Sequence, residues 1–198
     1  MMDFRGNQFY PFALDWQEQS NGRPVIPGMG IYFLHPSEGN WDLDEVERQI
    51  NFIRAEGMSG EAHYRAAFLL DMDTQGLYET LTEKYYTSPA LQPAMPWLDA
   101  EAPTAPAGLH KTPTQEGATC LTWEASADND PVNAPMYVIY ASDTYPVDTT
   151  RPQNIIAQSV RDTTNVHTPL LPWATPKYFA VTSLCPYGTA RVPWQPQP

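Results

Sequence analysis

The pattern of apolar and polar residues changes along the chain, and the first half contains two long apolar runs. The run at 26–34 reads IPGMGIYFL, and the run at 60–70 reads GEAHYRAAFLL, with its polar residues in the first half. Strands that are buried on both faces of a parallel sheet have this composition. We therefore expect parallel strands at 26–34 and 60–70, joined by a right-handed crossover.

The segment between the two runs has the features of an amphipathic helix. Asp42 is placed as an N-cap, with Glu45 three residues later in a variant of the capping box. Gly57 follows the segment, as a glycine does after the last turn of many helices. Four apolar residues recur at helical spacing and predict the buried face: Leu43, Val46, Ile50 and Ile53.

Further segments complete the first half of the chain. A second helix is predicted at 74–86, with Leu77 and Leu81 on its inner face. The aromatic-rich residues 1–16 are interpreted as the end of a strand and the start of a loop, and Asp15 as the polar start of a helix.

Beyond residues 100–108 (AEAPTAPAG) the hydrophobic period becomes two. This segment is proline-rich and stiff, as the linkers at domain boundaries often are. Four short alternating runs follow it, separated by turn residues, at 118–123, 136–141, 154–160 and 178–185. Short strands with regular turn signals predict an antiparallel β-sandwich, for which about 100 residues suffice.

The overall charge narrows the classes of partner. The chain has 11 basic and 23 acidic residues and a net charge of −12. This balance argues against nucleic acid and anionic membranes as partners, because binding to either depends on clusters of Lys and Arg. No apolar run approaches the roughly 18–20 residues that span a bilayer. The first residues, MMDFRGNQFYPFALDW, lack the basic start and apolar core of a signal peptide.

Motifs for metal, phosphate or a serine nucleophile are absent from the sequence. The four histidines at 35, 63, 110 and 167 are scattered, without HxxxH or CxxC spacing, so no metal site and no cofactor are predicted. The glycines at 28 and 30 lack the third glycine and the following helix of a phosphate-binding loop. No GxSxG motif is present.

The second half of the chain resembles a fibronectin type III domain. The residues that carry the resemblance are 103–109 as the entry strand, 121–123 on the second strand, 137–140 on the third, and 178–188 as the sixth strand and its turn. The resemblance implies that Trp123 is the central core aromatic residue. It also places Cys120 on the outer face and Cys185 in the other sheet, which favours two free thiols over a disulfide.

The first half resembles the C-terminal end of a bacterial (β/α)₈ barrel related to family 10 glycosyl hydrolases, a group common in secreted enzymes of gut Bacteroidetes. The segments that carry the resemblance are FYPFALDW at 9–16, PGMGIYFL at 27–34, EVERQINFIRAEGMSG at 45–60, YRAAFLL at 64–70 and YYTSPALQPAMPWLD at 85–99. The implied fold is α/β plus all-β, in which residues 1–99 form the last two to three βα units, 100–108 a linker and 109–198 the sandwich. The first five or so barrel units are missing.

The resemblance also implies where the site lies, because barrel enzymes gather their active-site side chains at the C-terminal ends of strands. This rule selects Asp3 and Arg5, then Tyr32, His35 and Glu38, then His63, Tyr64 and Arg65. Among them Glu38 is the catalytic candidate. The candidates for substrate binding are Tyr32, His35, His63 and Arg65.

Each candidate has a simpler alternative. Glu38 is otherwise a solvated loop acid or a charge at the entry of a helix, and His35 is otherwise a turn residue. Arg65 either binds a substrate hydroxyl or carboxylate or neutralises an acid such as Glu61. His63 and Arg65 are expected on one face of their strand. The tryptophans have two interpretations, either as platforms on which sugars stack or, more often, as core and interface residues. These residues are Trp16, Trp41, Trp97, Trp173 and Trp194.

The function implied by the resemblance is hydrolysis of O-glycosyl bonds by an enzyme of which this chain is the C-terminal part. The expected location is periplasmic, cell-surface or secreted, and the expected partners are a carbohydrate substrate and the missing N-terminal portion of the barrel. Glycosidases need a pair of carboxylates across the scissile bond, so the chain is expected to be inactive alone. The alternatives are a non-enzymatic carbohydrate-binding module and a structural or scaffold module.

Overall fold

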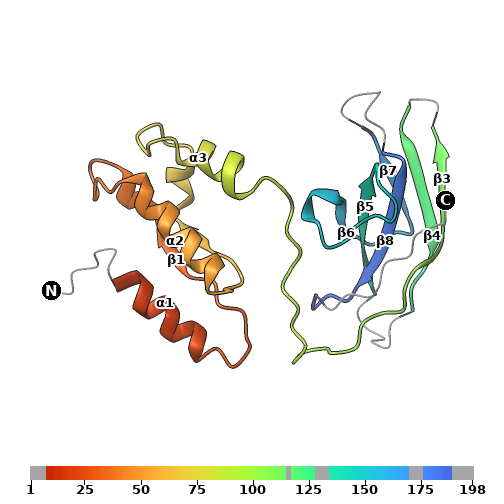
Figure 1. Cartoon of the computed structure of the whole chain (residues 1–198), viewed down its shortest axis with the longest axis horizontal. Helices are drawn as coiled ribbons and strands as arrows, with labels where there is room; N and C mark the ends of the chain where they lie inside the picture. Colours follow the sequence, from red (N-terminus) through yellow and green to blue (C-terminus); the bar gives the residue numbers. More distant parts are fainter. Residues whose placement is uncertain (1–7, 115–116, 128–133, 170–175, 189–198) are drawn as a thin grey trace. The chain divides into compact units, whose positions relative to one another are not determined.

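The structure is a computed structural model, and it describes residues 8–114, 117–127, 134–169 and 176–188. Two compact units divide the chain, Met1–Thr87 and Ser88–Pro198, here termed the N-terminal and C-terminal units (Figure 1). The candidates Asp3 and Arg5 lie outside the described residues, as do Trp173 and Trp194. No helix within the described ranges has both the length and the apolar character needed to cross a membrane.

A short parallel sheet organises the N-terminal unit. Strand β1 (Gly28–Gly30) pairs in parallel with β2 (Ala62–Tyr64), and the helix α2 (Leu43–Ala55) lies between them in the sequence (Figure 1). The predicted parallel pairing is confirmed. The predicted strand lengths are wrong, because the 3-10 helices η2 (Ile31–Leu34) and η3 (Ala66–Leu69) take up the second half of each apolar run.

Gly30 explains why the first run turns after three residues. A Cβ atom at this position would lie 2.9 Å from Cδ2 of Phe33. The ring of Phe33 therefore packs directly on the backbone of Gly30, where a residue with a Cβ atom would clash with it. Ile31 and Leu34 are both fully buried in η2, so the apolar run is explained by burial in a helical turn as well as by a strand.

The amino end of α2 forms where it was predicted. The side chain of Asp42 caps it by accepting a hydrogen bond from the backbone N–H of Asp44 at 3.0 Å. Glu45 does not close a capping box, because its carboxylate accepts hydrogen bonds from the hydroxyl of Tyr10 at 3.2 Å and from Arg48 at 2.6 Å. Glu45, at the third position of α2, thus links this helix to Tyr10 in another part of the unit.

The carboxyl end of α2 is a Schellman motif. Gly57 has a φ of +67°, and its N–H donates to the carbonyl of Arg54. The N–H of Met58 donates to the carbonyl of Ile53 at 3.0 Å, and the buried side chains of these two residues supply the apolar contact typical of the motif. The prediction that Gly57 ends the helix is confirmed.

The first described segment is a helix, so the interpretation of residues 1–16 as strand and loop is wrong for residues 9–16, and its first seven residues lie outside the described part of the chain. Helix α1 spans Phe9–Glu18. Pro11 is compatible with it because the residue falls in the first turn, where backbone N–H groups lack partners in any helix. Asp15 lies near the carboxyl end of α1, where its carbonyl accepts from Gln19, so it does not begin a helix.

The last helical segment of this unit begins as α3 (Leu77–Thr80) and continues as a π-helical turn at Leu81–Tyr85. Leu77 and Leu81 are buried as predicted. They join a core that contains Ala13, Met29, Ile31, Leu34, Val46, Ile50, Ile53, Met58, Leu77, Leu81 and Tyr85.

The C-terminal unit contains two antiparallel sheets of three strands each (Figure 1). One has the order β3–β4–β7 and the other the order β6–β5–β8. Their bounds are Ala107–Pro113 for β3, Thr119–Glu124 for β4, Met136–Ser142 for β5, Ile155–Val160 for β6, Thr164–His167 for β7 and Tyr178–Leu184 for β8. The four strands predicted from alternation are confirmed, and β7 is an additional one.

The entry strand begins later than the expected 103–109. Pro103 and Pro106 have no N–H to donate to a ladder, and regular pairing starts with Ala107 opposite Glu124. The register then shifts before His110, at a point where Gly108 adopts a φ of +60°.

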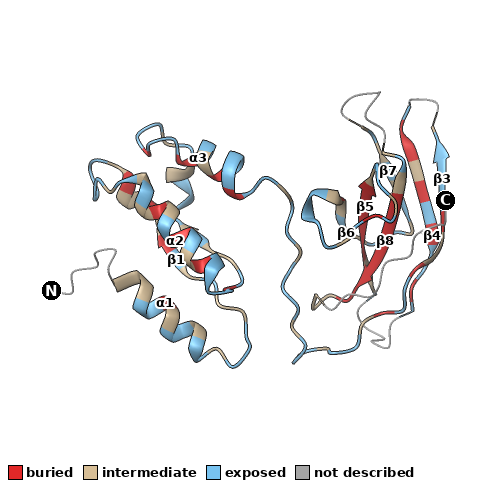
Figure 2. Ribbon diagram, in the orientation of Figure 1, coloured by how far each residue is buried: buried red, intermediate tan, exposed pale blue. Residues whose placement is uncertain are grey.

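The two sheets share a core. Side chains of β3, β4, β5 and β8 form it: Leu109, Leu121, Trp123, Tyr137, Ile139, Ala141, Phe179 and Val181. Trp123 meets Tyr137 edge to face, with 5.3 Å between the ring centroids. Strands β5 and β8 are buried along most of their length (Figure 2). Both cysteines are free thiols, as expected, with Cys120 half-buried and Cys185 buried.

A second apolar cluster covers the other face of the β6–β5–β8 sheet and includes part of the segment before β3. Leu91 packs against it, and the backbone N–H of Met95 donates to the carbonyl of Tyr187 at 2.8 Å. Residues 88–99 therefore belong to the C-terminal unit, whereas the sequence had grouped them with the barrel portion.

Candidate functional site

Aromatic side chains gather at the carboxyl ends of β1 and β2. The ring of Tyr32, in η2, lies edge to face with Tyr64, with 5.9 Å between their centroids. Phe68, in η3, lies 6.3 Å from Tyr32. Tyr64 is 64% exposed. The two strands thus end at an accessible aromatic patch, which we define as Tyr32, Tyr64 and Phe68.

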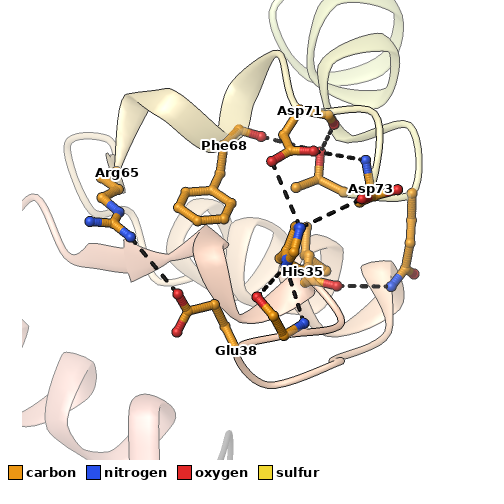
Figure 3. A network of polar contacts seen from close by, with 10 residues as sticks. His35, Glu38, Arg65, Phe68, Asp71 and Asp73 are labelled. Carbon is orange, nitrogen blue, oxygen red and sulfur yellow. Dashed lines mark hydrogen bonds and ion pairs between the residues drawn. The ribbon is translucent and has the colours of Figure 1, made fainter.

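An ion pair lies beside this patch. Nη2 of Arg65 is 3.8 Å from Oε1 of Glu38, and its guanidinium stands 5.1 Å from the ring centroid of Phe68 (Figure 3). The acid that Arg65 neutralises is therefore Glu38. Because Asp42 caps α2, Glu38 is not the residue at the helix entry, and it remains available to a ligand on the loop.

His35 lies on the other side of Phe68 and faces two aspartates (Figure 3). Its Nε2 is 3.6 Å from Oδ2 of Asp73 and 4.0 Å from Oδ2 of Asp71. Its Nδ1 accepts a hydrogen bond from the N–H of Ser37 at 3.1 Å and lies 2.7 Å from the Ser37 hydroxyl. His35 is thus both a turn residue and a member of a polar cluster.

His63 lies in a separate network. Its Nε2 is 2.9 Å from the hydroxyl of Tyr86, which donates to Oε1 of Glu61 at 2.5 Å. The side chain of Glu61 is 4% exposed, and Arg54 lies 4.0 Å from it. Strand β2 ends at Tyr64, so strand alternation does not relate His63 to Arg65, and the expectation that they share a face is wrong.

Burial dominates the titration of this second network. It lowers the pKa of His63, and the charge of Glu61 opposes that shift. It also raises the pKa of Tyr86 above its ordinary value, together with the hydrogen bond that Tyr86 donates to Glu61. Tyr86 therefore stays protonated as a donor throughout the physiological pH range.

The structure brings together four of the five candidates for catalysis and substrate binding, namely Tyr32, His35, Glu38 and Arg65, and leaves His63 apart. It adds Asp71, Asp73 and Phe68, which sequence reasoning did not select. Phe68 lies within the second apolar run, and the only signal for Asp71 and Asp73 was a position soon after that run. Nothing in the spacing of Asp71 and Asp73 indicates His35 as their neighbour.

A cavity of about 590 Å³ lies elsewhere in the N-terminal unit. Helix α1 and residues 24–28 form much of its wall, and Trp16 and Trp41 are among its lining residues. Trp16 is 70% exposed, whereas Trp41 stacks on Phe33 with 4.5 Å between their centroids. The lining is predominantly apolar.

The comparison with known proteins finds a glycosyl hydrolase. The chain is 28% identical over 133 residues to glycosyl hydrolase YngK of Bacillus subtilis (strain 168). This match covers 65% of the chain but only 26% of the relative, so the chain spans about a quarter of that protein's length. No family model matches the chain.

Proposed function

We propose that this chain is the C-terminal part of a glycoside hydrolase that acts on a polysaccharide or oligosaccharide. The N-terminal unit supplies the last units of a (β/α)₈ barrel, and residues 109–198 supply an accessory fibronectin type III-like sandwich. The partial similarity to a glycosyl hydrolase supports the first assignment. The second is supported by two antiparallel sheets around one core with Trp123 inside it. A periplasmic, cell-surface or secreted location belongs to the same proposal.

The observation that carries the proposal is the side-chain cluster at the carboxyl ends of β1 and β2. The aromatic patch offers apolar faces on which the C–H groups of a pyranose ring can stack. The carboxylate of Glu38 and the guanidinium of Arg65 lie beside it, and both groups are able to hydrogen-bond to the hydroxyl groups of a sugar. Apolar faces with a few polar groups are typical of small-ligand sites, and barrel enzymes place their sites at this end of the strands.

The open edges of the parallel sheet support the proposal that the sheet is part of a larger barrel. Among the described residues it contains only β1 and β2, so each strand has one edge without a strand partner. Phe12, Trp16 and Ile26 are more than half exposed along the cavity beside β1. Open strand edges and exposed apolar side chains are normally covered in a native protein. We propose that the missing N-terminal portion of the barrel covers these strand edges and apolar side chains.

Hydrolysis requires a second acid from that missing portion. Retaining enzymes place two carboxyl groups about 5–5.5 Å apart and inverting enzymes about 6.5–9.5 Å apart. Glu38 is the acid that this chain brings to the proposed cleft. Its ion pair with Arg65 also suits the alternative function, a non-enzymatic carbohydrate-binding module, because a paired carboxylate is held as a hydrogen-bond acceptor.

Binding of oligosaccharides to the full chain tests the proposal. A panel of polysaccharide-derived oligosaccharides is titrated calorimetrically into the chain and into the variants Tyr64→Ala and Arg65→Met. We expect one class of oligosaccharide to bind, and each variant to weaken binding about tenfold, equivalent to about 1.4 kcal/mol. Val166→Ala, at an exposed position of the C-terminal unit, is the control and should bind as the wild type does.

Two outcomes separate the functions. Binding without release of reducing sugar by the chain, together with hydrolysis by a longer protein that contains the whole barrel, supports the hydrolase. Binding without hydrolysis by either protein supports the carbohydrate-binding module. Absence of binding across the panel, or equal loss in the Val166→Ala variant, contradicts both.

A further inference from the structure

His35, Asp71 and Asp73 bring three ligand atoms of metal-binding type to one point (Figure 3). One atom of each, the imidazole Nε2 and two carboxylate oxygens, lies within 4.8 Å of the other two. For a tetrahedral zinc ion with ligands at about 2.1 Å, the ligand atoms lie about 3.4 Å apart. The observed separations of 3.6 and 4.0 Å from Nε2 approach that value without rearrangement of the backbone.

Further interactions hold two of the three ligands in place. The other carboxylate oxygen of Asp71 accepts the backbone N–H of Asp73 at 3.0 Å, which leaves Oδ2 directed at His35. The imidazole of His35 packs edge to face against Phe68 at 5.7 Å, and Ser37 contacts its Nδ1. Histidines that bind metals almost always donate the N–H of their second ring nitrogen to an acceptor, and the hydroxyl of Ser37 is placed to accept it.

The charge of the cluster is not compensated by a permanent cation in the described part of the chain. The ion pairs that the structure records for Asp71 and Asp73 are both with His35. The guanidinium of Arg65, across Phe68, pairs with Glu38 instead. Two carboxylates that face each other repel, and a cation between them would remove that repulsion.

We propose that His35, Asp71 and Asp73 bind a divalent transition-metal ion, with Zn²⁺ as the best match and water in the remaining position. One imidazole and two carboxylates suit zinc, whereas Ca²⁺ and Mg²⁺ prefer sites made of oxygen alone. The inference rests on these three residues and does not depend on the proposed hydrolase function.

The tautomer of His35 sets a condition on binding. An ion at Nε2 requires the ring proton to be on Nδ1, from which it donates to the hydroxyl of Ser37 at 2.7 Å. The backbone N–H of Ser37, now 3.1 Å from Nδ1, then loses its acceptor. Ser37 is partly solvent-accessible, so water replaces that acceptor. The competing arrangement without metal is the present one, in which the N–H of Ser37 donates to Nδ1.

Titration of the untagged, metal-free full chain with Zn²⁺ distinguishes the two arrangements. We expect one equivalent to bind. Loss of a ligand in His35→Gln, Asp71→Asn or Asp73→Asn should weaken binding by at least about tenfold, the lower bound known even for residues behind the ligands. His110→Gln, on the exposed face of β3, and Asp44→Asn, on α2, are the matched controls and should keep the wild-type affinity.

Substitution by Co²⁺ provides a second readout that a structural defect cannot imitate. A tetrahedral Co²⁺ complex should absorb visible light in the wild-type chain and in both controls, and not in His35→Gln. Asp73 is the most exposed ligand, with 70% of its side chain accessible, so Asp73→Asn remains folded if the other variants do not. Absence of stoichiometric binding, or equal weakening in His110→Gln, overturns the proposal.

Discussion

His63 shows at the scale of one residue how packing determines protonation. The hydroxyl of Tyr86 has one proton, which it donates to Glu61, so it accepts from Nε2–H of His63. Nδ1 of His63 therefore carries the lone pair, and it is buried with no hydrogen-bond partner among the described residues. A second proton on this ring would be placed in a site that offers it no acceptor, in keeping with the lowered pKa of His63.

His63→Gln should change the pH dependence of stability. Burial holds the pKa of His63 below the ordinary value of about 6.5. The unfolded chain therefore binds more protons in the window between the folded pKa and about 6.5, and the free energy of unfolding falls as the pH is lowered through it. The glutamine variant should lack this decrease. Urea unfolding from about pH 5 to about pH 7.5 measures it.

Unfolding of the wild type and of His63→Gln should be followed by NMR, through the amide resonances of the N-terminal unit alone. Burial also lowers the pKa of His167 in the C-terminal unit, and that histidine would add its own pH dependence to a global signal. If the N-terminal unit of His63→Gln follows the same pH profile as the wild type, the account of His63 is wrong.

Four side chains of the candidate site were predictable because they lie within the two apolar runs or in the loop after the first. The carboxyl ends of two adjacent parallel strands lie side by side. This places Tyr32, His35, Glu38 and Arg65 near one another. Asp71 was not predictable, since a turn after η3 brings it back to His35, and a turn leaves no periodic trace in the sequence. His63 was misplaced because its partner Tyr86 lies 23 residues away and outside the strand pattern.

Individual elements were predicted best where a capping residue marked their ends. Asp42 and Gly57 placed both ends of α2. The strands at 26–34 and 60–70 were predicted too long, because an apolar run reports burial and not backbone conformation. Within the first run, Ile31 is fully buried in a 3-10 turn and not in a strand.

Gly57→Ala should destabilise the N-terminal unit through its backbone alone. A Cβ atom at Gly57 meets no atom within 4 Å, but its φ of +67° is unfavourable for alanine, and the cost is roughly 1–2 kcal/mol. Gly28→Ala is the matched control, since its Cβ also meets no atom within 4 Å and its φ is not positive. Urea midpoints read from amide resonances of α2 compare the two variants.

The comparison with Gly28→Ala decides whether the left-handed conformation in the Schellman motif causes the loss of stability in Gly57→Ala. We expect Gly57→Ala to lower the midpoint and Gly28→Ala to leave it nearly unchanged. Equal losses in both variants would show that added bulk, and not the left-handed conformation, destabilises this unit.

At the scale of the whole molecule, the chain combines a parallel βαβ arrangement with two antiparallel sheets, each in its own compact unit. The change of hydrophobic period along the sequence predicted this division, since period two is specific to half-buried strands. The position of the boundary was less predictable. Leu91 lies in a proline-rich stretch without regular structure, and only its contact with the apolar cluster on β5 and β8 assigns it to the C-terminal unit.

The central claim is that the carboxyl ends of β1 and β2 form part of a carbohydrate-binding cleft. A ¹H–¹⁵N NMR titration of the full chain with the best-bound oligosaccharide tests it most directly. We predict saturable shifts that are largest at the amides of Tyr32, Glu38, Tyr64 and Arg65, and small shifts in the C-terminal unit. Shifts centred on the C-terminal unit, or no saturable shift with any oligosaccharide of the panel, would contradict the account.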